Sequence, residues 1–350
     1  MSDITTLETI GCDLGDKKST VCVLDLEGKV RERTEVQMKK ESVRKFFARP
    51  KAHVVIEVGA QSRWVSELLK ELGHEVTIAN ARRVALISKN SKKSDRTDAE
   101  LLARLGRSDT SLLSPMQHRD KEKQADLAIP RTRDALVSTR TQLINHIRGV
   151  VKSFGVRFPS CTSDCFYKKT EGLIPVELKP ALGALYRVLG EVETQLREYA
   201  KQIDKLAKKY HEIGAVQQID GVGPVTAASF VLTLGDKDRF KSSRMAGAYL
   251  GLRPRQSQSG DADPQLRITK EGDPFLRRLL VNCANYILGP FGKESDLRTW
   301  GLRLMERGGK NARKRAKVAV ARKLAVLMHR LWITGEVYEP TGYQAKRLAA

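Results

Sequence analysis

The stretch "TIGCDLGDKKSTVCVLDLEGKV" (residues 9–30) decides the fold of the first part of the chain. Its first segment, "TIGCDLG", is short and apolar, and we expect it to form a strand. A second segment, "KSTVCVLDLEGKV", follows, with Glu27 and Gly28 as a turn. We therefore predict a β-hairpin here, with Asp13 following the first strand.

The segments downstream alternate between strand and helix patterns. "HVVIEVG" (53–59) and "HEVTIAN" (74–80) are typical of strands, whereas residues 43–49, 62–73 and 97–107 predict helices. A hairpin followed by βαβ units predicts a mixed sheet covered by helices. We assign residues 1–125 to this α/β domain.

The remainder of the chain carries helical patterns. Residues 132–155 predict one helix, and a long basic helix is expected over residues 311–335. Between them, apolar residues recur three and four apart over four heptads: Leu182, Leu185, Leu189, Val192, Leu196, Tyr199, Ile203, Leu206 and Tyr210. Such a seam indicates either an antiparallel helix pair within one chain or an intermolecular coiled coil, and both can hold at once. We predict a helical coiled-coil linker over residues 126–210 and a mostly α C-terminal domain over residues 211–350.

The charge of the chain indicates a polyanionic partner. Its 350 residues include 63 Lys and Arg against 41 Asp and Glu, a net charge of +22, which favours nucleic acid. No run of about 18 apolar residues exists, so we expect no membrane span. The first 15 residues lack a signal-peptide pattern. With Cys161 and Cys165 lacking a second ligand pair, we expect no zinc site and a reduced, cytoplasmic protein.

Four acidic residues form the most informative pattern. Glu57 lies in an apolar strand, where a carboxylate costs several kcal/mol unless it is paired or binds a metal. Asp95 and Asp98 are three apart at the start of a helix, where capping alone is the simpler explanation. With Asp13, however, their order fits a ribonuclease-H-like sheet whose carboxylates converge on two Mg²⁺ ions.

The first hairpin also permits a different interpretation. "IGCDLGDKKSTVCVLD" resembles the first phosphate loop of actin-like sugar kinases and chaperone ATPases, which share this sheet. Those enzymes carry a second Asp-x-Gly-x-Gly-Thr loop, and this sequence has none, so we favour the metal-dependent interpretation.

Two loops of the C-terminal region are candidates for DNA chemistry. "DGVGPVTAA" (220–228) resembles a helix-hairpin-helix turn, in which Gly221 and Gly223 let backbone N–H groups face a phosphate; a plain connector is the alternative. "PRQSQSG" (254–260) contains Ser257 and Ser259. Serine is a poor nucleophile unless a base or metal activates it, so the residues alone leave both as ordinary loop serines.

Taken together, these motifs resemble the DEDD transposases of the insertion sequence 110 family, the bridge-RNA-guided DNA recombinases. The matching segments are "IGCDLG", "VVIEVGA", "KKSDRTDAELLA", "IDGVGPVTAASFV", "RFKSSRMAGAYLGLRPRQSQSG" and "RITKEGDPFLRRLLV". The resemblance covers nearly the whole chain in the family's order. It implies an RNase H-like (RuvC-like) N-terminal domain, a coiled-coil linker and a C-terminal transposase domain with a nucleophilic serine.

The resemblance also implies roles for single residues. Asp13, Glu57, Asp95 and Asp98 correspond to the catalytic, metal-binding acids. Ser259, which precedes a glycine, corresponds to the nucleophile, whereas Ser257 lacks that glycine. One departure is "EVGA" after Glu57, where relatives often carry Thr or Ser and then Gly.

The function implied is transposition of a bacterial insertion sequence. Strands would be cleaved and exchanged through a serine–DNA intermediate with Mg²⁺, and a structured bridge RNA would select donor and target DNA by base pairing. We expect a homo-oligomer, dimer or tetramer, that associates with the nucleoid when active. The alternatives are a RuvC-like junction nuclease that uses water and a non-catalytic nucleic-acid-binding protein.

Overall fold

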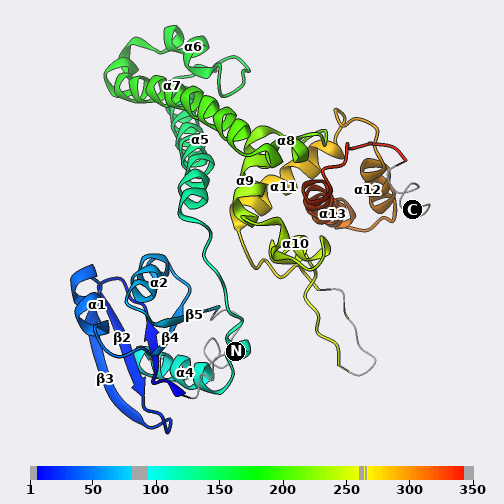
Figure 1. Cartoon of the computed structure of the whole chain (residues 1–350). Coiled ribbons are helices and arrows are strands. Elements are labelled where there is room, and N and C mark those ends of the chain that lie inside the picture. The colour runs from blue at the N-terminus through cyan, green and yellow to red at the C-terminus, as the bar shows by residue number, and fades with distance from the viewer. Residues whose placement is uncertain (1–5, 81–93, 260–263, 265, 343–350) are drawn as a thin grey trace. The chain divides into compact units, whose positions relative to one another are not determined.

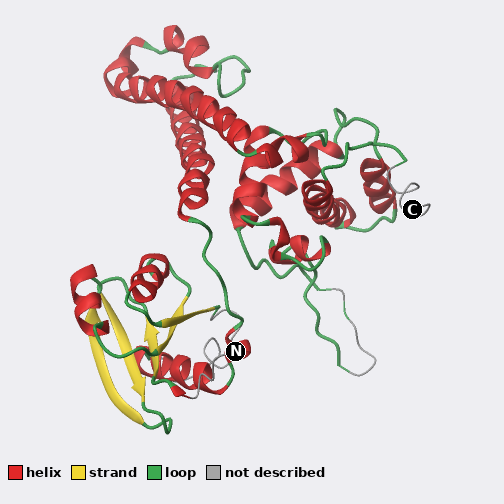
Figure 2. Ribbon diagram, in the orientation of Figure 1, coloured by secondary structure: helices red, strands yellow, loops and turns green. Residues whose placement is uncertain are grey.

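A computed structural model describes residues 6–80, 94–259, 264 and 266–342 of the chain. The chain divides into two compact units, Met1–His118 and Arg119–Ala350 (Figure 1). The first contains a sheet with helices, and the second is mostly helical (Figure 2). The expectation of an α/β N-terminal region followed by a mostly α region is thus confirmed. The division into three domains stays a prediction.

Five strands form one mixed sheet in the first unit, in the order β3-β2-β1-β4-β5. Their bounds are β1 Thr9–Asp13, β2 Lys18–Leu24, β3 Val30–Gln37, β4 His53–Glu57 and β5 Glu75–Ala79. β1 pairs antiparallel with β2, which pairs antiparallel with β3. On its other side β1 pairs parallel with β4, and β4 pairs parallel with β5. The predicted hairpin and both downstream strands are therefore present, with β1 in the centre.

The sequence patterns do not predict β3. Its residues, "VRERTEVQ", are mostly charged or polar, and only Val36 is buried. β3 occupies one edge of the sheet, where charged side chains protect an unpaired edge from pairing with other chains. An edge strand of this kind has too few buried residues for its apolar pattern to stand out.

Helices cover both faces of the sheet (Figure 1). On one face, α1 (Lys40–Phe47) and α2 (Ser62–Glu71) pack Phe47 and Leu69 into a cluster with Val54 of β4. On the other, α4 (Asp95–Ser108) packs Leu102 against Val55. Val54 and Val55 serve opposite faces because successive side chains alternate across a strand. The short η2 (Thr110–Leu113) follows α4.

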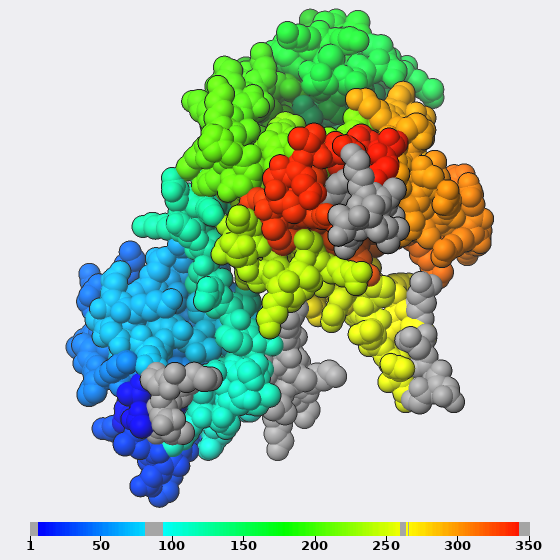
Figure 3. Space-filling view, turned by 45° about the vertical axis from the view of Figure 1, so that its right-hand side comes forward, coloured from blue at the N-terminus to red at the C-terminus, as the bar shows by residue number. Residues whose placement is uncertain are grey.

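The second unit consists of nine α-helices and three 3₁₀ turns within its described residues. The helices are α5 Lys121–Ser153, α6 Phe166–Thr170, α7 Lys179–Lys209, α8 His211–Gln217, α9 Pro224–Leu234, α10 Arg244–Tyr249, α11 Pro274–Ile287, α12 Asp296–Glu306 and α13 Ala312–Thr334; the turns are η3 Glu171–Leu173, η4 Val176–Leu178 and η5 Lys237–Arg239. α9 is buried from Thr226 to Leu234. It shares one core with α8, α11 and α13, and Figure 3 shows red C-terminal residues packed among green, yellow-green and orange segments.

The predicted seam packs within the chain. α7 lies against α5, and its residues Leu182 and Leu189 are buried with Ile147 of α5. Near the other end of α7, Lys209 forms an ion pair with Asp126, so the two helices run antiparallel. The structure therefore has the antiparallel helix pair within one chain, and the coiled-coil linker and an intermolecular coiled coil stay predictions.

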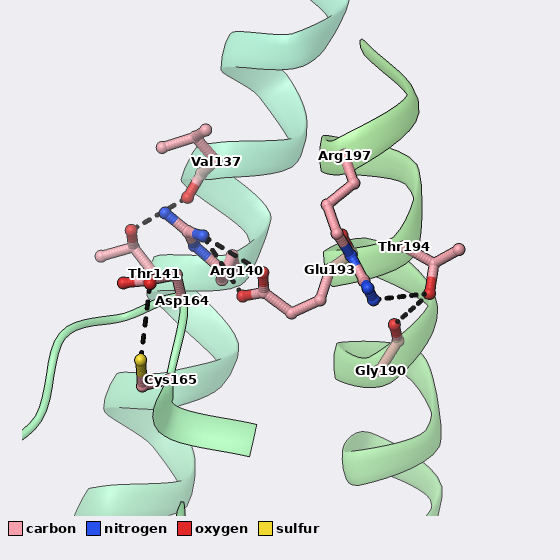
Figure 4. A network of polar contacts seen from close by, with 9 residues as sticks. All are labelled: Val137, Arg140, Thr141, Asp164, Cys165, Gly190, Glu193, Thr194 and Arg197. Carbon is pink, nitrogen blue, oxygen red and sulfur yellow. Dashed lines mark hydrogen bonds and ion pairs between the residues drawn. The ribbon is translucent and has the colours of Figure 1, made fainter. Parts of the chain in front are cut away.

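A polar contact also joins this helix pair. Arg140 of α5 meets Glu193 of α7 at 3.2 Å, and both side chains are largely covered (Figure 4). Beside it, the Cys165 thiol donates to Asp164. Within the described ranges, no helix is long and apolar enough to cross a membrane.

Candidate active site

Two of the predicted acids end neighbouring parallel strands. Asp13 is the last residue of β1 and Glu57 is the last residue of β4. The register pairs Cys12 with Ile56, so the next position along each strand carries a carboxylate. Glu57 thus belongs to its otherwise apolar strand, as predicted, but it ends the strand and is half-buried, as Asp13 is. Partial exposure lowers the cost of its charge and leaves it accessible to a ligand.

Glycine in β1 sets how closely the acid-bearing helix approaches. A Cβ atom on Gly11 would lie 2.0 Å from the carbonyl oxygen of Ala99 and 2.5 Å from the backbone nitrogen of Ala103. The same helix presents Gly106 to Val55, where a Cβ atom would meet the valine side chain at 2.3 Å. Small residues at 99, 103 and 106 thus let α4 lie directly on β1 and β4. The sequence analysis did not predict this close packing. The spacing of four and then three residues between Ala99, Ala103 and Gly106 could have indicated it.

Asp95 and Asp98 lie in the first turn of α4, but their surroundings differ. Ser94 is the N-cap, and its Oγ accepts a hydrogen bond from the Thr97 N–H, so neither aspartate caps the helix. Asp98 is only 5 % exposed, whereas Asp95 is exposed. The positive end of the helix dipole stabilises both charges. Asp98 precedes Ala99, which meets Gly11, and this places its backbone beside β1.

The donor set has the chemistry that Mg²⁺ requires. Carboxylate oxygens are its preferred protein ligands, and a Mg²⁺ ion keeps several waters, so one or two protein ligands suffice for each ion. Asp13, Glu57 and Asp98 come from three elements that pack on one another. No group of three or more His, Cys, Asp or Glu within metal-binding reach exists among the residues that the structure describes. The four acids therefore fit the ion in chemical kind, and their role as ligands stays a prediction.

Cys12, next to Asp13, lies in the core of the sheet. Its side chain is 2 % exposed, and burial raises the pKa of the Cys12 thiol far above its usual range, with opposing and supporting charges from Arg49 and Asp13. A thiol that stays protonated is a poor metal ligand, which confirms Cys12 as a core residue.

The candidate serines lie on a segment of the second unit that leaves α10 and returns to α11; we call its described residues 251–259, 264 and 266–272 the serine arm (Figure 1). Ser257 and Ser259 are both exposed. At the base of the arm, Gly251 and Gly272 have positive φ values of 69° and 79°. A Cβ atom on Gly251 would lie 2.1 Å from the carbonyl oxygen of Glu271, so the two ends of the arm are in backbone contact.

One arginine ties both ends of the serine arm together. The Nη1 of Arg277 donates to the carbonyl oxygens of Leu250 and Glu271, each at 3.0 Å. Burial lowers the pKa of Arg277, and the negative charge of Asp273 opposes that shift. The sequence analysis did not single out Arg277, because the local pattern does not show which of the adjacent Arg277 and Arg278 is directed into the protein.

The histidine of α13 is not available to activate the serines. His329 is fully buried in α13. Its Nε2 lies 3.1 Å from the carbonyl oxygen of Lys237 and therefore donates to it, while Nδ1 accepts from Ser243 at 3.1 Å. Burial lowers the pKa of His329. Both ring nitrogens of His329 are engaged, so this residue does not activate a serine.

The other predicted nucleic-acid features are present as local structure. Gly221 and Gly223 form the turn between α8 and α9, and Gly221 has φ 87°. This turn borders a cavity of about 430 Å³ that Asn282 and Tyr286 of α11 also line. The basic helix is α13, and Arg313, Lys314 and Arg315 at its start are exposed.

Comparison with known families identifies both halves of the chain. The model of the "Transposase IS116/IS110/IS902 family" matches residues 214–295, which include the serine arm. The DEDD transposase model for IS110, described as "Transposase", matches residues 10–155, which include all four acids.

Curated relatives extend the likeness over most of the chain. The transposase for insertion sequence element IS1111A of Coxiella burnetii is 30% identical over 341 residues, covering 95% of this chain and 91% of the relative. A probable family 20 transposase of Pseudomonas aeruginosa is 28% identical and covers 95% and 99%. The transposase for IS1328 of Yersinia enterocolitica is 29% identical and covers 79% and 82%.

Proposed function

Since the chain belongs to the IS116/IS110/IS902 family of insertion-sequence transposases, we propose that it cleaves and exchanges DNA strands with a metal-assisted serine nucleophile. The observation that carries this proposal is the edge of the sheet at which Asp13 and Glu57 end adjacent parallel strands beside the acid-bearing start of α4. The strand order β3-β2-β1-β4-β5 supports an RNase H-like assignment of this unit.

The four acids would hold Mg²⁺, which when bound stabilises charge on the scissile phosphate. Asp13 and Glu57 are placed on rigid strands, so their oxygens are oriented before DNA arrives. Asp98 is fixed by burial, and the more exposed Asp95 stands one turn earlier on the same helix. The site would thus have three carboxylates with fixed positions and a fourth, that of Asp95, whose side chain is free to change conformation.

Ser259 is the proposed nucleophile. Its Oγ would attack the phosphorus and lose its proton, a phosphoserine ester would form, and one strand would depart with a free hydroxyl. Attack of another strand's hydroxyl on that ester would release the serine and join the new strands. We propose that a guide RNA selects both DNAs by base pairing, and that dimers or tetramers carry out the exchange.

A covalent adduct tests this function. Purified protein with its copurifying RNA is incubated with Mg²⁺ and labelled DNA, and adducts are separated under denaturing conditions. We expect wild type and Ser257→Ala to form the adduct, and Ser259→Ala and Asp13→Asn to lose it. Cleavage without an adduct in Ser259→Ala would instead indicate a junction nuclease that uses water, and unchanged activity in Asp13→Asn and Glu57→Gln would indicate a non-catalytic binder.

Mixing variants tests whether the serine acts in a partner subunit. Asp13→Asn and Ser259→Ala each lack one half of the proposed site. If Ser259 acts on the acids of another subunit, a mixture of the two inactive proteins regains adduct formation. A mixture as inactive as its components would place acids and serine in the same chain.

A further inference from the structure

The base of the serine arm is a two-stranded antiparallel ribbon. The Arg255 N–H donates to the carbonyl oxygen of Arg267, and the Thr269 N–H donates to that of Arg253, both at 2.9 Å. These bonds flank a bridge between Pro254 and Ile268. The ribbon therefore has a fixed register, with Arg255 opposite Arg267.

This register gathers arginines on one face. Side chains two residues apart on a strand point to the same face, so Arg253 and Arg255 share a face. Arg267 joins them from across the ribbon. Like charges directly opposite each other destabilise a β-ribbon, and the pair Arg255–Arg267 is such an arrangement. We call these three residues the arginine face.

No acidic side chain compensates the arginine face within the ranges that the structure describes. All three arginines are exposed, and none has an ion pair there, whereas Arg131 and Arg278 of the same unit pair with Asp273 and Asp134. The cost of gathering three cations falls when an anion lies over them. Guanidinium groups bind phosphate oxygens through parallel N–H bonds.

We propose that the arginine face binds consecutive phosphates of the DNA strand that Ser259 cleaves, an assignment that rests on the proposed function. Arg253 and Arg255 are about 6.6 Å apart along the ribbon, a spacing suited to successive phosphates of one strand. Ser259 lies four residues beyond Arg255. The serine arm would therefore bind the DNA backbone on one side of the phosphodiester bond that Ser259 attacks.

Contacts where the serine arm begins and ends fix the position of the arginine face. Gly251 and Gly272 bring the two ends of the arm into backbone contact, and Arg277 bonds to carbonyl oxygens at both ends. Both strands of the ribbon are therefore fixed beside α10 and α11. Phosphates bound to the arginine face would be held at a set position relative to that base.

The test removes charge from the face without touching the serine. The triple variant Arg253→Gln, Arg255→Gln, Arg267→Gln is compared with a matched control, Arg157→Gln, Lys168→Gln, Lys169→Gln. The control removes three exposed cations at the far end of the α5–α7 pair (Figure 1). Binding of the full chain to a labelled DNA duplex and to an RNA hairpin is measured against NaCl concentration, and adduct formation against DNA concentration.

We expect the arginine-face variant to bind DNA at least about tenfold more weakly near 0.1 M salt, and its slope of log affinity against log salt to fall by about 2 to 3. The DNA concentration for half-maximal adduct should rise by a similar factor. DNA binding equal to that of the control variant, or a loss confined to RNA, would overturn the proposal. Wild type that binds DNA through the face but forms no adduct would overturn the serine mechanism instead.

Discussion

The backbone of Gly11 in β1 lies directly beneath that of Ala99 in α4, at a distance that leaves no room for a side chain. This contact joins the strand that ends in Asp13 to the helix that begins with Asp95 and Asp98. Packing between these two elements therefore controls the relative positions of three proposed metal ligands.

Gly11→Ala should disturb the site without altering any acid. The added methyl group would meet the Ala99 carbonyl oxygen at 2.0 Å, so α4 must move away from β1. We expect a loss of about 1–3 kcal/mol in the free energy of unfolding and a marked loss of DNA cleavage. Chemical denaturation and the adduct assay measure both. Gly59→Ala is the control, because a Cβ atom there has no neighbour within 4 Å; equal stability of the two variants would contradict the packing argument.

Charged substitutions on α7 should separate folding from assembly. Leu189 is fully buried against α5, so Leu189→Glu should unfold the helix pair and reveal nothing about oligomers. Val188, its neighbour, is 49% exposed. Val188→Glu should leave the circular dichroism spectrum unchanged. If α7 also forms an intermolecular coiled coil through this side, the mass in solution should fall; an unchanged mass argues against that interface.

Arg277→Gln should slow chemistry more than it weakens DNA binding. It removes hydrogen bonds to the carbonyl oxygens of Leu250 and Glu271, which hold the two ends of the serine arm. We expect the adduct rate at saturating DNA to fall by about tenfold, because misplacing reacting atoms by about 1 Å costs up to 100-fold. The salt slope of DNA binding should not change. Arg278→Gln, which removes an exposed ion pair with Asp134 and a cation–π contact with Phe275 but no bond to the serine arm, should keep the wild-type rate.

His329 should make stability depend on pH. Burial lowers its pKa below the usual 6.5, so the unfolded chain takes up a proton before the folded chain does. Its stability contribution is therefore fully present above pH 6.5 and is lost as the pH falls through 6.5 towards the folded pKa. Urea denaturation at several pH values should show a smaller loss on acidification in His329→Gln than in wild type. The exposed His146→Gln should behave like wild type, and equal pH profiles in all three proteins would refute the assignment.

The sequence by itself determined the elements whose apolar pattern is strong. β1, β2, β4 and β5, the helices around them, the seam of α7 and the basic helix α13 follow from alternation and from three-four spacing, because burial on one face imposes these periods. It also predicted which strand or helix carries each of the four acids. The sequence did not predict β3, because this edge strand buries only Val36 and so lacks an apolar pattern.

Only the tertiary structure decided how these elements meet. In the tertiary structure α4 packs directly on Gly11, and β4 ends at Glu57. Asp98 is buried while Asp95 is exposed, and the α7 seam packs against α5 within the chain. The tertiary structure also brought Arg255 opposite Arg267 and set Arg277 across the base of the serine arm. Such contacts join residues far apart in the sequence, and they depend on close packing of small residues and on backbone register, neither of which a local pattern records.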